Sequence, residues 1–128
     1  MDIIEKYYPL REKTEKIIGK GIDVHKHLGF GFLEIVYKDA LEYEFRNTGI
    51  NFAREKEYTI RYKDSILPHK FFADIVVFDQ VILEIKAKDG IANEDMAQTL
   101  NYLKCSGCKV GLILNFGKSK LDIKRVVY

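Results

Sequence analysis

The spacing of hydrophobic and polar residues divides the chain into a helical first part and a second part with strand-like alternation. Residues 2–12 are mixed in character, and Pro9 separates a short first helix from the next one. From Thr14 onward apolar residues recur at helical spacing, so we expect a helix that Thr14 caps and Gly29 ends. Its apolar positions are Ile17, Ile18, Ile22 (or Gly21), Val24 and Leu28.

A second helix is predicted after a Gly-Phe-Gly breaker at residues 29–31. Residues 33–48 place apolar side chains three and four positions apart, and Gly49 provides a stop signal. These apolar positions are Leu33, Val36, Tyr37, Ala40, Leu41 and Phe45. Two successive helices therefore precede the first strand.

The periodicity changes to two after Gly49. The segment 52–62 alternates charged and apolar residues, which predicts an edge strand or a half-exposed strand. Residues 63–65 are expected to form a turn. Residues 66–69 include Pro68, so we expect them to be a connection rather than a central strand.

The most informative stretch is a predicted hairpin of strands 71–78 and 81–86. Asp74 interrupts the apolar pattern of the first strand, and Glu84 and Lys86 interrupt that of the second. Glu84 and Lys86 are two apart, so their side chains leave the same face of an extended strand. Because charges in such apolar strands are costly to bury alone, these residues form either a salt bridge at a wet strand end or a functional site.

The turn of this hairpin decides whether Asp74 shares a face with Glu84. A two-residue turn would pair Asp74 with Ile85 and would point the two carboxylates to opposite faces. An odd-length turn that pairs Val77 with Val81, or a bulge before the turn, would bring them together. We predict that one of these two arrangements is present.

A helix and two strands complete the predicted order. Asn93 is expected to cap a helix over residues 94–106, which carries acidic residues in its first turn and ends at Gly107. Residues 110–116 are almost wholly apolar, as is typical of a strand buried on both faces. Residues 121–127 are a candidate for a last strand.

The predicted order is helix, helix, three strands, helix, strand and possibly one more strand. The helix between strands 81–86 and 110–116 implies a parallel or mixed sheet with a right-handed connection. The predicted class is therefore α/β, or α+β by a stricter definition. The 128 residues are 47% hydrophobic and 31% charged, which fits one soluble globular domain.

Charge and composition exclude few functions. The formal net charge of +2 neither requires nor rules out a nucleic-acid partner, because a carboxylate site offsets a basic rim. No apolar run approaches the roughly 20 residues of a membrane span and no signal peptide opens the chain, so we expect a cytoplasmic protein without a membrane partner.

Two other groups of residues invite a metal or redox interpretation. His25 and His27 are two apart on a helix and diverge, so they cannot bind one ion; His25 is expected to be structural or to line the site, and His27 to be exposed. Cys105 and Cys108 form a lone CxxC that closes a helix, so we expect two small core residues rather than a zinc or thioredoxin-type site.

Two carboxylates beside a lysine suit phosphodiester hydrolysis. Asp74 and Glu84 offer hard oxygen atoms to Mg²⁺ or Mn²⁺, which lowers the pKa of a bound water and shields phosphate charge. Lys86 can orient that water or stabilise charge on the phosphoryl oxygens. A metal-dependent nuclease is therefore the favoured hypothesis.

The same residues resemble a known signature. Asp74 followed by Glu84-Ile85-Lys86 resembles the D…(D/E)-x-K pattern of the PD-(D/E)XK nuclease superfamily, with Ala73 in place of its proline. Residues 31–37 match the G-x-x-E-x-x-Y motif that names the GxxExxY protein family. Residues 98–102 match the Q-x-x-x-Y helix of exonuclease-like members. The similarity extends over nearly the whole chain.

The resemblance implies one nuclease-like domain over residues 1–128, with a three-layer core in which helices flank a mixed sheet. It implies metal ligands from Asp74, Glu84, the backbone carbonyl of Ile85 and Glu34, the last directly or through water. The catalytic residues that it implies are Glu34, Asp74, Glu84, Lys86, Gln98 and Tyr102.

The sequence alone also allows other roles for these residues. Glu34 is also explained as a solvated acid at a helix start, and Gln98 and Tyr102 as a surface glutamine and a core tyrosine. The whole chain is either a nuclease acting on DNA or RNA or a non-catalytic module that binds nucleic acid or a protein. A homodimer or a partner protein could supply the grip on substrate that so small a chain lacks.

Overall fold

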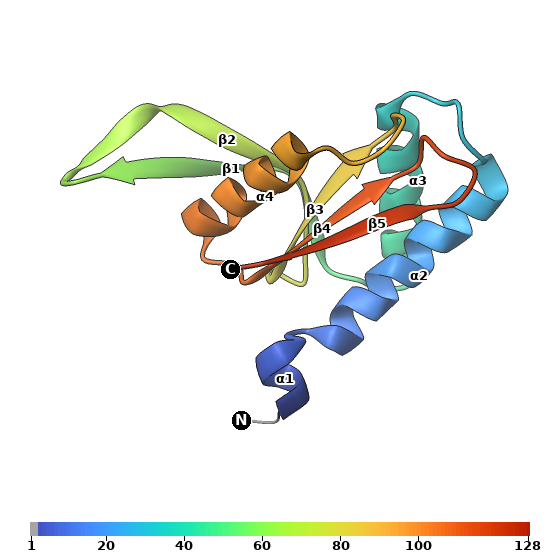
Figure 1. The fold of residues 1–128 in the computed structure, drawn as a ribbon, viewed down its shortest axis with the longest axis horizontal. Helices are drawn as coiled ribbons and strands as arrows, with labels where there is room; N and C mark the ends of the chain where they lie inside the picture. The colour runs from blue at the N-terminus through green and yellow to red at the C-terminus, as the bar shows by residue number, and fades with distance from the viewer. Residues whose placement is uncertain (1–2) are drawn as a thin grey trace.

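A central sheet lies between helices in the computed structural model, which describes residues 3–128 (Figure 1). Within those residues no helix combines the length and the apolar character needed to cross a membrane. The elements in chain order are α1 (Ile3–Tyr7), α2 (Arg11–Leu28), α3 (Glu34–Asn47), β1 (Phe52–Tyr62), β2 (Ser65–Val77), β3 (Val81–Lys86), α4 (Asn93–Ser106), β4 (Val110–Asn115) and β5 (Asp122–Val127).

The five strands form one mixed sheet in the order β1-β2-β3-β4-β5. Neighbouring strands are antiparallel except β3 and β4, which run parallel and are connected by α4. This arrangement confirms the predicted element order, the last strand and the α/β class, which the stricter definition calls α+β.

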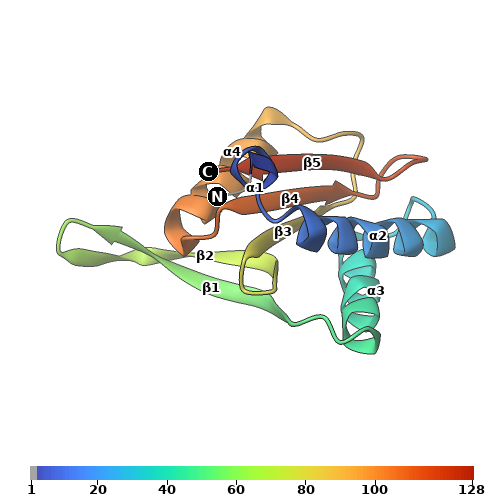
Figure 2. The same cartoon turned by 90° about the horizontal axis from the view of Figure 1, so that it is seen from below.

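Apolar side chains pack on both faces of the sheet, and Figure 2 shows α4 on one side and α2 with α3 on the other. The cluster under α2 and α3 contains Ile17, Val24, Tyr37, Leu41, Phe45, Ile75, Val77, Val81, Leu83, Ile85, Leu112, Leu114 and Phe116. The cluster under α4 contains Ala73, Val76, Ile82, Tyr102, Leu103 and Cys108. Every residue of β4 is buried, as predicted for a strand covered on both faces. On α2, Gly21 faces this core and Ile22 is exposed.

Beyond the sheet, β1 and β2 continue as a two-stranded arm (Figure 1). The prediction that residues 66–69 form a connection is wrong, because β2 is continuous through Pro68. The register shifts at this point, so that the three residues from Leu67 to His69 lie opposite Ile60. A bulge in a solvent-exposed arm tolerates a residue without an N–H, since no central ladder bond is lost.

Both predicted N-terminal helix caps are wrong. Thr14 lies inside α2, where its buried hydroxyl donates to the carbonyl oxygen three residues earlier and accepts a hydrogen bond from Arg125 at 3.0 Å. At the start of α4, Asn93 is already helical and Ala92 occupies the cap position. The Asp95 carboxylate accepts the Ala92 N–H at 2.9 Å, so an acid in the first turn, and not an Asn93 cap, satisfies a main-chain donor at this helix start.

Candidate active site

The predicted turn geometry is confirmed. Val77 pairs with Val81, so three residues form the turn of the β2–β3 hairpin. The ladder then continues to the pair Ile75–Leu83 and stops. With this odd-length turn, Asp74 and Glu84 become the next residues on the two strands.

Asp74 and Glu84 complete the hairpin with their side chains instead of their main chains. The Asp74 N–H donates to Glu84 Oε2 at 2.9 Å, and the Ile85 N–H donates to Asp74 Oδ2 at 2.8 Å. Two carboxylates therefore lie side by side where β2 and β3 separate. We call Asp74 and Glu84 the carboxylate fork.

An irregularity in the neighbouring strand accompanies the fork. Glu55 of β1 has a φ of 53° and falls between the paired residues Arg54 and Lys56, at the level of Asp74. Residues two apart on a regular strand share a face, yet Ala73 packs under α4 and Ile75 packs under α2 and α3. The change of face at Asp74 lets its side chain lie between the two strands.

Glu84 lies in an environment that opposes its charge. Its side chain is 3% exposed, and burial, with a further contribution from Asp74, raises its pKa from 4.5 to about 8. The hydrogen bond from the Asp74 N–H and the charges of Lys86 and Lys38 act in the opposite direction. A buried carboxylate with a raised pKa beside a second carboxylate is characteristic of a functional site.

Lys38 is the main site residue that sequence reasoning missed. Its ammonium nitrogen lies 2.8 Å from Asp74 Oδ1, 3.5 Å from Glu55 Oε1 and 3.9 Å from Glu34 Oε1. Burial alone would lower the pKa of Lys38, but the hydrogen bond and charge of Asp74 outweigh it and raise that pKa. The available sequence signal was the Glu34–Lys38 spacing of four on one helix.

Glu34 stands at the edge of this group. It is the first residue of α3 and its side chain is 45% exposed. Its carboxylate lies 3.9 Å from the Lys38 ammonium, which in turn contacts Asp74, so Glu34 is near the fork without direct contact to either carboxylate of the fork.

Lys86 reaches toward α4. Its side chain is largely buried, and its nitrogen lies 4.0 Å from Asp95 Oδ1. Lys88 pairs with the other oxygen of Asp95. Burial raises the pKa of Asp95, but the bonds from Lys88 and from the Ala92 N–H outweigh burial and lower it. Asp95 is therefore a second residue that the sequence prediction missed, and it holds Lys86 and Lys88 at one end of β3.

Tyr102 and Gln98 project from the same stripe of α4, one turn apart. Tyr102 is buried, and burial together with the nearby charges of Glu84 and Asp74 raises its pKa to about 12. Tyr102 packs under α4 in the same apolar cluster as Ala73, the residue before Asp74. Gln98 is exposed, one turn before Tyr102.

His25, His27 and Cys108 lie as predicted from the sequence, whereas Cys105 is outside the core. His25 is buried, and its Nε2 lies 2.8 Å from the Lys118 carbonyl oxygen, whereas His27 is exposed. Cys105 is half-buried and Cys108 is buried, both as free thiols. These residues are structural and lie outside the fork.

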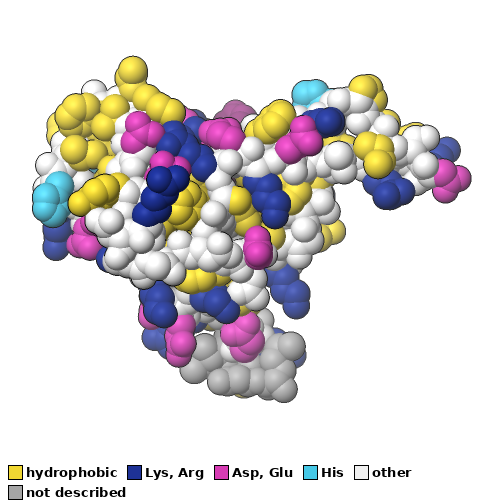
Figure 3. Space-filling model, turned by 180° about the vertical axis from the view of Figure 1, so that it is seen from behind, with side chains coloured by type: hydrophobic (Ala, Val, Ile, Leu, Met, Phe, Trp, Pro, Cys, Tyr) yellow, Lys and Arg dark blue, Asp and Glu magenta, His cyan; other side chains and the backbone are white. Residues whose placement is uncertain are grey.

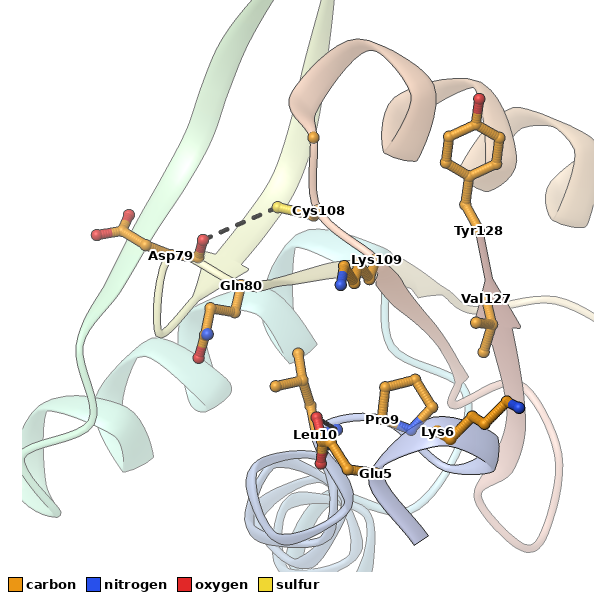
Figure 4. Close-up of a pocket in the computed structure, with 11 residues that line it drawn as sticks. Glu5, Lys6, Pro9, Leu10, Asp79, Gln80, Cys108, Lys109, Val127 and Tyr128 are labelled. Atoms are coloured by element: carbon orange, nitrogen blue, oxygen red, sulfur yellow. Dashed lines mark hydrogen bonds between the residues drawn. The ribbon is translucent and has the colours of Figure 1, made fainter. Parts of the chain in front are cut away.

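A separate cavity of about 530 Å³ lies at the other end of the parallel strands (Figure 4). It is bordered by the turn before β3, at Asp79 and Gln80, and by Lys109 before β4, whereas the fork lies toward the end of β3. Neither fork carboxylate lines this cavity.

Comparison with known proteins identifies the superfamily of the chain. The family model described as the PD-(D/E)XK nuclease superfamily matches residues 11–126. The chain belongs to this superfamily. The crystal structure of SSO0001 matches the superfamily domain with a TM-score of 0.58 and 17% sequence identity, covering 73% of this chain and 50% of that one. This likeness shows the fold alone, and the chain spans half the length of the SSO0001 chain. No curated protein matches the sequence significantly.

Nucleases of the superfamily usually use divalent metals, and the fork has suitable donor chemistry. Within residues 3–128 no three His, Cys, Asp or Glu side chains are grouped so that they could hold an ion together. Mg²⁺, however, typically takes only one or two protein carboxylates and completes its shell with water and phosphate oxygen. Asp74 and Glu84 provide two carboxylates, each fixed through one oxygen by a main-chain N–H. The Ile85 carbonyl leaves its strand on the same side as the Ile85 N–H, toward Asp74.

Proposed function

We propose that this superfamily member is a metal-dependent nuclease that hydrolyses phosphodiester bonds in DNA or RNA. The observation that carries the proposal is the fork itself, two carboxylates held by main-chain N–H groups with Lys86 two residues away on the same strand. Asp74, Glu84 and the Ile85 carbonyl would hold Mg²⁺ or Mn²⁺, with Glu34 contributing through water. When bound, the metal supplies a water of lowered pKa and shields the phosphate charge.

The chain's own residues have distinct roles in this proposal. Lys86 orients the attacking water and stabilises negative charge on the phosphoryl oxygens, and Asp95 holds the Lys86 ammonium toward α4. The Tyr102 hydroxyl, whose pKa burial raises to about 12, is protonated and can donate a hydrogen bond to a ligand at the fork. Gln98, exposed one turn away on α4, is available to the substrate phosphate.

We also propose that the protein belongs to the GxxExxY group, because residues 31–37 carry that motif. Residues 1–128 would form one nuclease-like domain, and the expected location is cytoplasmic. A homodimer or a protein partner would extend the surface available to a nucleic acid. A non-catalytic module with the same fold is the alternative function.

Incubation with single-stranded and duplex DNA and RNA tests the proposal, with Mg²⁺, Mn²⁺ or EDTA in parallel. We expect cleavage that requires the metal and that is lost in Lys86→Ala but kept in Lys104→Ala, an exposed lysine of α4. Calorimetry should show Mn²⁺ binding to the wild type and to Lys86→Ala, but not to Asp74→Asn.

Two results together would contradict the nuclease proposal. One is the absence of cleavage on every substrate, and the other is the absence of divalent-ion binding that depends on Asp74. Nucleic-acid or protein binding without either property would identify the non-catalytic alternative.

A further inference from the structure

Four large apolar side chains stand out from the loop before α3 and from its first turn. Their exposed fractions are 62% for Phe30, 47% for Phe32, 76% for Leu33 and 50% for Ile35. Figure 3 shows hydrophobic side chains gathered at this end of the molecule, beside clustered lysine, arginine and acidic side chains. We call these four residues the apolar rim. A contiguous patch of this kind marks a binding surface more often than chance exposure does.

The backbone that carries the apolar rim is held firmly. The buried Tyr37 hydroxyl donates to the Gly29 carbonyl at 2.7 Å and accepts the Phe32 N–H at 3.3 Å. The Tyr37 ring stacks on Phe116 with 4.5 Å between ring centroids. Gly29 and Gly31 have φ values of 69° and 110°, which residues with a side chain rarely adopt. The motif glycine and tyrosine therefore keep the loop in one shape, with Phe30 largely exposed and the half-exposed Phe32 ring edge-on to Tyr37.

The apolar rim borders the carboxylate fork. Glu34 lies between Leu33 and Ile35, and the Lys38 ammonium lies within 3.9 Å of Glu34 and 2.8 Å of Asp74. The rim is therefore connected to the fork through Glu34 and Lys38, and a ligand that extends from the fork past Lys38 along the start of α3 would reach it.

Lysines border the other side of the same end of the sheet. The His25–Lys118 contact holds the loop after β4 against the end of α2, close to where the rim begins. The Lys118 side chain lies near Gly90 of the β3–α4 connection, and Lys88, two residues before Gly90, pairs with Asp95 of α4. An anionic backbone over the fork would meet the exposed Lys118 as well as the aromatic rings of the rim, whereas Lys88 is already paired with Asp95.

We propose that the apolar rim stacks against unpaired bases of a nucleic-acid strand, so that the substrate class is single-stranded. The inference rests on the proposed nuclease function for the position of the phosphate backbone. Exposed phenylalanine rings can stack on the face of any base, whereas in a duplex those faces are covered by neighbouring pairs. A rigid loop favours such binding, because little conformational entropy is lost when the rings are engaged.

Fluorescence anisotropy with labelled oligothymidine or oligouridine of about 12 nucleotides tests the proposal. EDTA is present throughout, so that binding is measured without metal or cleavage. We expect Phe30→Ala to raise the dissociation constant about tenfold, and the double variant with Phe32→Ala to raise it further. Tyr43→Ala removes an exposed aromatic ring elsewhere on α3 and should leave binding unchanged.

Phe30→Leu separates stacking from simple apolar contact. Phe30 is mostly exposed, so this variant is expected to fold, which thermal unfolding checks. Binding as weak as in Phe30→Ala supports stacking, and binding like that of the wild type overturns it. If Phe30→Ala weakens binding to a blunt duplex as much as it weakens binding to the single strand, the proposal is also overturned.

Light scattering provides a further test of the occupant. If the wild type is a dimer and Phe30→Ala is a monomer with unchanged oligonucleotide affinity, the rim binds a second copy and the proposal is wrong. These binding measurements need no catalysis. Single-strand binding that depends on Phe30 can therefore be observed even if no nuclease activity is found, so failure of the stacking proposal is distinguishable from failure of the nuclease proposal.

Discussion

Replacing Glu84 with glutamine should change how the stability of the metal-free protein depends on pH. The wild-type side chain has a pKa raised from 4.5 to about 8 by burial and by Asp74. Glutamine keeps an oxygen that can accept the Asp74 N–H but cannot acquire the charge. The substitution therefore removes the titration with little change of shape.

The sign of the effect follows from proton binding. Between pH 4.5 and about 8 the folded protein keeps the Glu84 proton that the unfolded chain releases, so its free energy of unfolding falls as pH rises through this window. At about 1.4 kcal/mol per pH unit, the full difference sets an upper limit of about 5 kcal/mol. Relaxation around the buried charge reduces this, and we expect about 2–3 kcal/mol.

Urea unfolding of wild type and Glu84→Gln from about pH 5 to about pH 9, in EDTA, measures the effect. The difference between the two unfolding free energies should grow with pH in favour of Glu84→Gln, because other titrating groups are common to both proteins. Glu57→Gln, an exposed glutamate of the arm, is the matched control and should show a constant difference.

Adding Mn²⁺ at the upper pH should stabilise the wild type by about 2.7 kcal/mol at a hundredfold excess over its dissociation constant, and Glu84→Gln much less. Parallel pH profiles for wild type and Glu84→Gln would refute the reasoning, since they would mean that Glu84 is ionised across the whole range. They would also remove the electrostatic argument for a metal at the fork.

Three other outcomes follow from individual contacts. Lys38→Met removes a positive charge 2.8 Å from Asp74 and should tighten Mn²⁺ binding about tenfold by calorimetry. The control Lys56→Met should leave the Mn²⁺ affinity unchanged. An unchanged affinity in Lys38→Met would show that Lys38 does not compete with the metal. Tyr37→Phe should lower the free energy of unfolding by about 1–2 kcal/mol and speed amide exchange in the loop at residues 29–33; unaltered exchange would contradict the tethering role of its hydroxyl. Asn115→Ala should cost about 2–3 kcal/mol in urea, because its buried amide bonds both the N–H and the carbonyl of Lys88, and a cost below 1 kcal/mol would show that this contact is dispensable.

Local patterns in the sequence were enough to predict much of this fold. The bounds of β1 and the buried character of β4 follow from the alternation of residue types and from continuous apolar runs. The odd-length turn followed from a geometric requirement, because Asp74 and Glu84 share the fork only if Val77 pairs with Val81. Each of these inferences uses information within about a dozen residues of sequence.

What the sequence did not reveal depends on contacts between distant segments. Lys38 was not singled out from the sequence, because its partner Asp74 lies on β2, thirty-six residues later in the chain (74 − 38). Asp95 was read only as an acid in a helix start, although it also holds Lys86 and Lys88. Pro68 was interpreted as a break because proline disrupts the hydrogen-bond ladder of a central strand. A solvent-exposed arm tolerates it.

The fork also explains why two acids are tolerated in such apolar strands. When β2 leaves β3 to become the arm, the N–H groups of Asp74 and Ile85 lose the main-chain partners that a longer ladder would give them. The two carboxylates supply those acceptors, which offsets part of the cost of burying them. An alanine at Asp74 or Glu84 would leave a main-chain donor unsatisfied, at about 1–3 kcal/mol, in addition to removing a metal ligand. Loss of activity in alanine variants therefore cannot separate structure from chemistry, whereas Asp74→Asn and Glu84→Gln keep the acceptor and remove only the charge.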